Sequence, residues 1–116
     1  MLDLELAIQK AHMEFAIWTR ERVQELMACV AGRISGVRCD WDVANESWAV
    51  MSASRHGVAY ICAKIPIIIV ASRFVDDVRK CAKVDEAVIF EVSDFDDYRC
   101  KIAKSVLETI LRYSQK

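Results

Sequence analysis

The chain has 116 residues, of which 54% are hydrophobic, three are glycine and one is proline, so we expect one domain, residues 1–116, with a packed core and short connections. Its 16 basic and 17 acidic side chains leave a net charge of −1, which makes a dedicated nucleic-acid-binding protein unlikely. No apolar run reaches the roughly 18–20 residues that span a bilayer. The acidic start MLDLELAIQK is unlike an export signal, so we expect a soluble, cytoplasmic protein with no membrane partner.

Residues 3–31 contain no glycine or proline and are rich in good helix formers, which predicts helical structure. Asp3 is a suitable N-cap, and Gly32 can end the helix in a left-handed turn. The apolar residues recur at three- and four-residue steps, with a change of angle near the middle. They are Leu4, Ile8, Ala11, Phe15, Trp18, Val23, Met27, Val30 and Ile34. Two arrangements stay open, namely one continuous helix or two helices broken near residues 19–22.

The period then changes to two. Residues 37–43, VRCDWDV, alternate between apolar and polar side chains, as in a half-buried strand. A turn at 44–46 leads to a second strand, 47–54, and a turn at 55–57 leads to a third, 58–65. Three strands with such short connections predict an antiparallel meander.

Residues 66–71 fit either a strand or the first turn of the next helix, because Pro66 ends the third strand or places it at an edge. A helix is expected over 72–83 with Ser72 as its N-cap, followed by a strand over 87–93. A last helix is expected from Ser93 or Asp94 to about residue 114. The element order α-β-β-β-α-β-α predicts an α+β fold, with a mainly antiparallel sheet and helices packed against it.

The chain has five cysteines, an odd number, and no pair is spaced C-x-x-C. They are Cys29, Cys39, Cys62, Cys81 and Cys100. This spacing is unlike a disulfide framework or a local zinc site, and unpaired cysteines usually behave as small buried hydrophobes. We therefore expect all five to be reduced, with no bound metal and no cofactor.

Chemistry-bearing motifs are sparse, because no nucleophile elbow, P-loop or dinucleotide-binding pattern occurs. The order α-β-β-β-α-β is similar to the core of PD-(D/E)xK nucleases, and this resemblance implies Glu46 and Lys64 as weak catalytic candidates. Cys62, however, stands where that motif has a metal-binding acid, and a neutral thiol is a poor ligand for Mg²⁺. The simpler interpretation of Lys64 is a strand-end lysine whose ammonium reaches water. We expect no catalytic residue.

We therefore expect a small non-enzymatic protein-protein interaction or adaptor protein that acts as a homodimer. A continuous helix over residues 3–31 would be about 45 Å long, more than a domain of this size covers, so part of it would meet a second subunit. Phe15, Trp18, Met27 and Val30 are the predicted dimer or partner surface. A nuclease of the PD-(D/E)xK type, or a degenerate relative, is one alternative. A cargo-binding dimer similar to secretion chaperones, which share this element order, is another.

Overall fold

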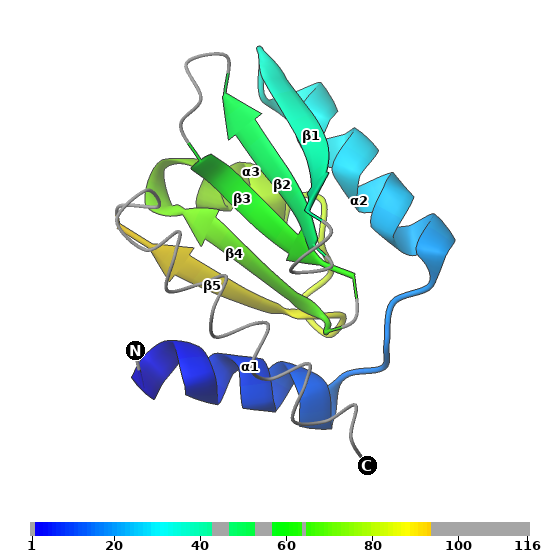
Figure 1. The fold of residues 1–116 in the computed structure, drawn as a ribbon, viewed down its shortest axis with the longest axis vertical. Coiled ribbons are helices and arrows are strands. Elements are labelled where there is room, and N and C mark those ends of the chain that lie inside the picture. Colours follow the sequence, from blue (N-terminus) through cyan, green and yellow to red (C-terminus); the bar gives the residue numbers. More distant parts are fainter. Residues whose placement is uncertain (1, 43–46, 53–56, 64, 94–116) are drawn as a thin grey trace.

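A computed structural model describes residues 2–42, 47–52, 57–63 and 65–93. It shows an α+β fold in which one five-stranded sheet is packed against helices (Figure 1), as the sequence predicts. The elements are α1 (Leu2–Glu14), α2 (Arg20–Arg33), β1 (Val37–Asp42), β2 (Ser47–Ser52), β3 (Gly57–Cys62), β4 (Ile67–Ala71), the 3-10 helix η1 (Ser72–Phe74), α3 (Val75–Arg79) and β5 (Val88–Val92). The last helix expected from the sequence lies outside the described residues.

The sheet has the strand order β1-β2-β3-β4-β5. β1 to β4 pair antiparallel, which confirms the predicted meander and adds a fourth strand to it. β5 pairs with β4 in parallel, so η1, α3 and the loop after them form a crossover between the two strands. The mainly antiparallel sheet is thus mixed at one edge.

The most apolar stretch of the chain forms two neighbouring strands. β3 and β4 are buried at every position, as expected of central strands that are covered on both faces. β3 ends at Cys62, earlier than the predicted residue 65, and residues 66–71 resolve into a strand and not a helical turn. Between the strands, the backbone N–H of Ile67 donates to the carbonyl oxygen of Ile65, 2.6 Å away, around Pro66. Because Pro66 cannot donate to a ladder, it marks this turn.

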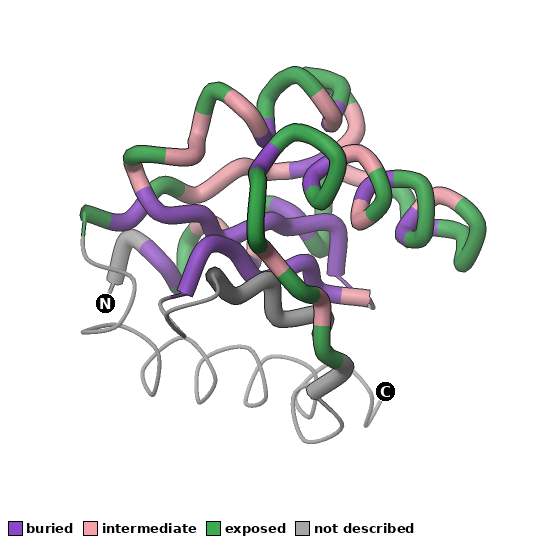
Figure 2. The backbone as a smooth tube through the Cα atoms, turned by 90° about the horizontal axis from the view of Figure 1, so that it is seen from above, coloured by how far each residue is buried: buried purple, intermediate pink, exposed green. Residues whose placement is uncertain are grey.

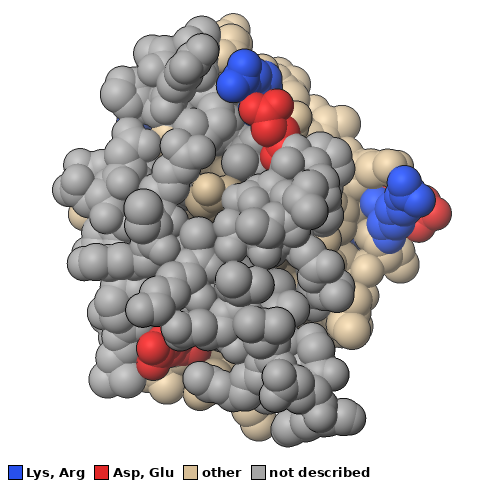
Figure 3. All heavy atoms as spheres, viewed as in Figure 1, with Lys and Arg blue, Asp and Glu red and all other residues tan. Residues whose placement is uncertain are grey.

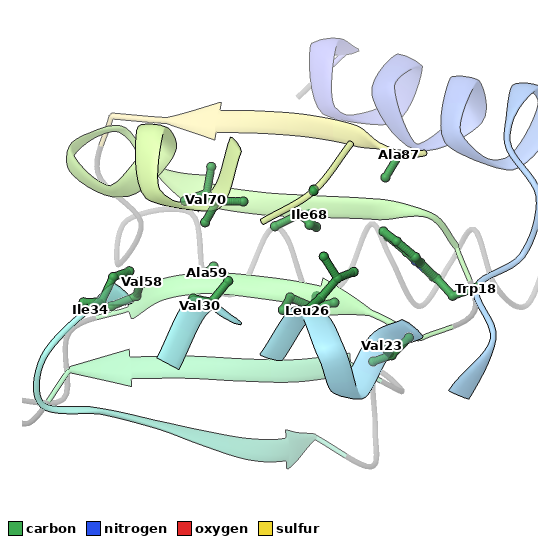
Figure 4. Packing of buried hydrophobic residues seen from close by; sticks show 13 residues of the cluster. Trp18, Val23, Leu26, Val30, Ile34, Val58, Ala59, Ile68, Val70 and Ala87 are labelled. Carbon is green, nitrogen blue, oxygen red and sulfur yellow. The ribbon is translucent and has the colours of Figure 1, made fainter. Parts of the chain in front are cut away.

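The alternating side chains of β4 divide the core into two clusters. Ile67, Ile69 and Ala71 join Leu4 and Ile8 of α1 in one cluster. Ile68 and Val70 join the apolar residues of α2 in the other, in which Leu26 and Val30 are fully buried. Figure 4 shows the second cluster, with the labelled side chains of α2 directed toward those of β3 and β4. The two helices therefore cover opposite faces of the sheet.

A β-bulge in β3 enlarges the α2 side of this core. Val50 lies opposite Ala59 and Met51 lies opposite Gly57, so Val58 is an extra residue without a partner position. A bulge of this kind interrupts the strict alternation of side chains along the strand. Consistent with this, the consecutive residues Val58 and Ala59 both belong to the α2 cluster. In Figure 2 the buried stretches of the backbone lie toward the centre of the molecule, and the exposed stretches lie on its outer turns.

The predicted helix over residues 3–31 is two helices. α1 ends at Glu14 and α2 begins at Arg20, so the break lies at residues 15–19. The sequence placed it slightly later, near residues 19–22. Thr19 explains where α2 starts, because its Oγ1 accepts a hydrogen bond from the backbone N–H of Arg22 at 3.1 Å. The alternative with two helices is therefore the correct one, although its break lies a few residues earlier, and the two helices pack in different core clusters.

Three predicted caps are also wrong. Asp3 lies inside α1, and Gly32 lies inside α2, which continues to Arg33. The left-handed glycine is instead Gly36, with φ 71°, in the turn before β1. Ser72 is no N-cap, because its hydroxyl donates to the carbonyl oxygen of Val92, 3.1 Å away, and so ties β4 to the end of β5. The helix expected over 72–83 is shorter, with η1 followed by α3 to Arg79.

Candidate functional site

Helix α1 carries apolar side chains on two opposite faces. Leu4, Ile8 and Ala11 are buried against the sheet, with 2% or less of their surface exposed. Leu6 is 53% exposed and Met13 is 77% exposed. Since each residue advances about 100° around a helix, Leu6 and Met13 lie almost in line with each other and roughly opposite to the buried stripe. The polar residues of α1 therefore lie mainly on the two flanks between these apolar faces.

A third exposed apolar side chain follows the end of the helix. Ile17, in the linker between α1 and α2, is 73% exposed. We call Leu6, Met13 and Ile17 the outer α1 surface. Single exposed apolar residues are common on proteins, but a stripe on one face of a helix is what a partner helix or groove recognises. Among the described residues, the one other large hydrophobic side chain with such exposure is Val84, in the loop before β5.

Charged residues flank the outer α1 surface. Lys10 lies between Leu6 and Met13 on nearly the same face, and Glu14 follows Lys10 by one turn. Both side chains are exposed, as is Glu5 on the other flank. The outward face of α1 thus combines a short apolar stripe with one positive and one negative charge along the same edge.

The structure places two of the four residues that the sequence predicts as a partner surface in the core, and the other two are half-buried. Val30 is fully buried and Trp18 is 8% exposed, and both belong to the core cluster on the α2 side of the sheet. Met27 is half-buried and packs against that cluster, and Phe15 is half-buried in the linker. Trp18 and Val30 are therefore core residues of the subunit. Their burial within the subunit leaves these two side chains little surface for a partner to contact.

The nuclease-like candidates, Glu46 and Lys64, both lie outside the described residues. Cys62, at the position that would need an acid, is a fully buried thiol in the cluster beneath α1. Across the described ranges, no group of three His, Cys, Asp or Glu side chains is arranged to hold a metal ion.

A second feature links α2 to the loop before β5 and was missed by sequence reasoning. Arg22 forms a two-pronged ion pair with Glu86, in which Nε donates to Oε1, and Nη2 donates to Oε2 at 2.9 Å. Nη2 also donates to the carbonyl oxygen of Cys81 at 3.0 Å, and Nη1 to Oε2 of Glu25 at 3.2 Å. The backbone N–H of Lys83 completes the cluster by donating to Oε2 of Glu86 at 2.8 Å.

The electrostatics of this cluster follow from its hydrogen bonds. The side-chain hydrogen bond from Arg22 lowers the pKa of Glu86 below its ordinary value, although partial burial acts in the other direction. The same hydrogen bond raises the pKa of Arg22, again against burial. Both groups are therefore charged at neutral pH, and the loop is held to α2 by an ion pair with low exposure, 26% for Arg22 and 15% for Glu86.

The same loop is also bound to α2 covalently. Cys29 and Cys81 form a disulfide, with their Cα atoms 5.8 Å apart and a sequence separation of 52. The prediction that all five cysteines are reduced is therefore wrong for these two, because the fold brings the middle of α2 against the end of α3. Cys39 and Cys62 are thiols in the structure, and Cys100 lies outside the described residues. Burial raises the pKa of the Cys39 thiol, with the charge of Asp40 as a smaller cause.

Other charged side chains pair along the surface. Arg33 lies 3.6 Å from Asp77, and Arg38 lies 2.9 Å from Asp40. In the space-filling view of Figure 3, blue and red atoms of the described residues lie next to each other near the upper and right edges. On this face the described residues form no field of one sign, such as a nucleic-acid backbone requires.

Comparison of the chain with protein-family models, with curated proteins and with solved structures finds no match. Among the described residues, no helix is both long and apolar enough to cross a membrane.

Proposed function

We propose that this protein is a non-enzymatic protein-binding domain that associates with a second copy of itself through the outer α1 surface. The observation that carries the proposal is the exposure of Leu6 and Met13 on the face of α1 opposite to its buried stripe, together with exposed Ile17 in the linker that follows. Water-exposed apolar side chains in line along a helix gain free energy when a partner covers them.

The charges beside this stripe favour a second copy as the partner. Most soluble oligomers are symmetric and twofold dimers are the commonest, so two α1 helices would pack antiparallel across a twofold axis. If the axis passes between Lys10 and Met13, Leu6 of each copy lies toward the end of the other α1, from which the chain continues to Ile17. Lys10 then lies near Glu14 of the partner helix, and the symmetry repeats this pair of opposite charges. Parallel packing would instead place like charges side by side.

The size of the surface sets the expected affinity. Burial of a large aliphatic side chain contributes about 1.5–3 kcal/mol, and these side chains are only partly exposed to begin with. Two copies with three such residues each gain roughly 6–12 kcal/mol, against an association cost of about 4–15 kcal/mol. Even the most favourable combination leaves only about 8 kcal/mol, so we expect a weak dimer with a dissociation constant of about micromolar at the tightest and extending to about millimolar.

Analytical ultracentrifugation across that concentration range tests the proposal. The wild-type chain should shift from monomer to dimer, and Met13→Glu should weaken the association at least ten-fold, because it places a carboxylate inside the stripe. Val84→Glu is the matched control, since Val84 is 96% exposed on the loop that packs on α2. Val84→Glu should have only a small effect on the association. A chain that stays monomeric, or a dimer that Met13→Glu leaves unchanged, would refute the proposed surface.

We further propose that the protein works in the cytoplasm, as its sequence suggests. Disulfides that form in reducing compartments are usually transient and act in catalysis or redox sensing. A cytoplasmic location therefore requires that the Cys29–Cys81 disulfide can open and close while the subunit stays folded. No observation among the described residues favours the nuclease-like or the chaperone-like alternative.

A further inference from the structure

The loop before β5 is attached to α2 twice, once by a covalent bond and once by charges. Arg22 and Cys29 are seven residues apart on α2, and so lie on the same face of the helix two turns from each other. Cys29 bonds to Cys81, and Arg22 donates to the carbonyl oxygen of that same residue. Arg22 also holds Glu86, five residues further along the loop. The position of Cys81 therefore does not depend on its sulfur bond alone.

Both cysteines are half-buried, so the sulfur bond lies near the surface and not in the centre of either core cluster. Cys81 packs against the α2 cluster from its edge, next to fully buried Val78. The bond is therefore at the edge of the α2 cluster and not enclosed by the sheet. Val78, Val30 and Leu26 belong to the same buried apolar cluster, which joins α2, β4 and α3. These apolar contacts hold the elements together whether or not the disulfide is formed.

We propose that Cys29–Cys81 is a reversible thiol–disulfide exchange site for a thiol reductant, and that the Arg22–Glu86 pair keeps the two thiols together while the bond is open. The inference is independent of the proposed dimer, because it concerns the opposite face of the sheet. Arg22 and Glu86 act here as positioning residues.

The exchange balances with a dithiol as the reductant. One thiolate of the dithiol attacks the Sγ of Cys29, a mixed disulfide forms, the Cys29–Cys81 bond breaks, and the sulfur of Cys81 leaves as a thiolate that takes up a proton. The second thiol of the dithiol loses its proton and displaces the sulfur of Cys29, which is protonated in turn. The dithiol is oxidised to a disulfide by two electrons, and the protein gains two thiols.

The neighbours of Cys81 favour it as the leaving group. Lys80 and Lys83 are exposed residues close to it in sequence. Positive charges near a cysteine stabilise its thiolate, and a more stable thiolate leaves faster. Cys29 instead has Glu25 one turn before it and Arg33 one turn after it on α2, so opposite charges offset there.

Glutathione buffers of defined ratio provide the test, in which a second glutathione molecule takes the part of the second thiol and glutathione disulfide is the oxidised product. The fraction of protein with the Cys29–Cys81 bond is measured after acid quenching and alkylation, with mass spectrometry of the peptides that contain the two residues. For the wild-type chain we expect reversible opening, with the same equilibrium constant from both directions and an unchanged circular dichroism spectrum. In Arg22→Gln and in Glu86→Gln the equilibrium constant for closing the bond should fall about ten-fold, as for the loss of one partly exposed charged pair.

Arg20→Gln is the matched control, because Arg20 is an exposed arginine on the first turn of the same helix. It should leave the constant unchanged. Urea unfolding of the dithiol form of each variant, measured in parallel, separates positioning from stability. Glu86→Gln should lower the closing constant even where the dithiol form remains fully folded. Loss of the folded spectrum on reduction, or an equal closing constant in wild type and Arg22→Gln, would overturn the inference.

Discussion

The indole Nε1 of Trp18 donates a buried hydrogen bond to the carbonyl oxygen of Ile65, 3.2 Å away and 47 residues further along the chain. This bond joins the linker between α1 and α2 to the turn between β3 and β4. In Figure 4, Trp18 lies at the same end of the core cluster as Ala87, at the start of β5. Next to this turn, the backbone N–H of Val88 donates to the carbonyl oxygen of Pro66 at 2.9 Å. The linker thus crosses from one face of the sheet to the other at a fixed point.

Replacement of Trp18 by phenylalanine should lower the free energy of unfolding by about 1.5–3 kcal/mol. The change removes a buried hydrogen-bond donor and part of a buried aromatic ring. Urea unfolding at low micromolar concentration measures it, with Ile17→Ala as the control. Ile17 is the neighbouring residue but 73% exposed, so its loss should cost less than about 0.5 kcal/mol. Equal effects of the two changes would contradict the role of Trp18.

Two glycines should respond in opposite ways to replacement by alanine. Gly36 has φ 71°, a left-handed conformation that costs other residues about 1–2 kcal/mol, so Gly36→Ala should destabilise the fold by about that amount. Gly32 lies inside α2, and an added Cβ there would meet no atom within 4 Å. Gly32→Ala should therefore stabilise the fold by about 0.5–1 kcal/mol. Thermal unfolding of both variants checks the difference in sign.

The ion pair of Glu86 predicts a pH dependence of stability. Its pKa is lowered in the folded chain relative to about 4.3 in the unfolded one, so its stabilising contribution is complete above that value. The contribution is lost as the pH falls through the lower, folded pKa. Glu86→Gln should therefore cost about 1–2 kcal/mol at pH 7 and progressively less below about pH 4. Urea unfolding from pH 7 to about pH 3 measures this convergence.

Glu25→Gln is the control for this titration. The Glu25 side chain is 67% exposed and accepts one hydrogen bond from Arg22, so its loss should cost less than about 0.5 kcal/mol at any pH. If the free-energy curves of Glu86→Gln and wild type stay parallel down to low pH, Glu86 does not carry the predicted charge effect.

Local patterns in the sequence were sufficient for most of the fold. The alternation in residues 37–43 and the short connections after it predict β1 to β3, and the apolar stripe Leu4, Ile8, Ala11 predicts the buried face of α1. The strand β4 was left open, because a short, wholly apolar run has no period that separates a strand from a helix. Pairing with β3 and with β5 decides it, and those contacts are not local.

The features that sequence reasoning missed depend on tertiary contacts. Nothing between Phe15 and Trp18 interrupts the helical pattern, and the break follows from the long-range bond of Trp18, although Thr19 offered a local N-cap signal. Cys29 and Cys81 are paired by the approach of α2 to α3, which neither the odd number of cysteines nor their spacing reveals. The same approach pairs Arg22 with Glu86. The exposed Leu6 and Met13 could have been found, since they fall off the predicted buried stripe by half a turn.

The proposed antiparallel dimer makes a prediction about charge that a generic apolar contact would not. Lys10 of one copy should lie near Glu14 of the other, so Lys10→Glu should weaken association several-fold by placing like charges together. Glu14→Lys should do the same. The double variant, with the two charges exchanged, should recover the affinity of the wild-type chain, because the opposite charges again face each other. Both residues are exposed in the subunit, so none of the three variants should change its unfolding free energy by more than about 0.5 kcal/mol.

Sedimentation of the four chains at matched concentrations gives the comparison. If the two single variants weaken the dimer and the exchange fails to restore it, the helices meet in another orientation. If all four chains associate equally, the contact lies away from α1.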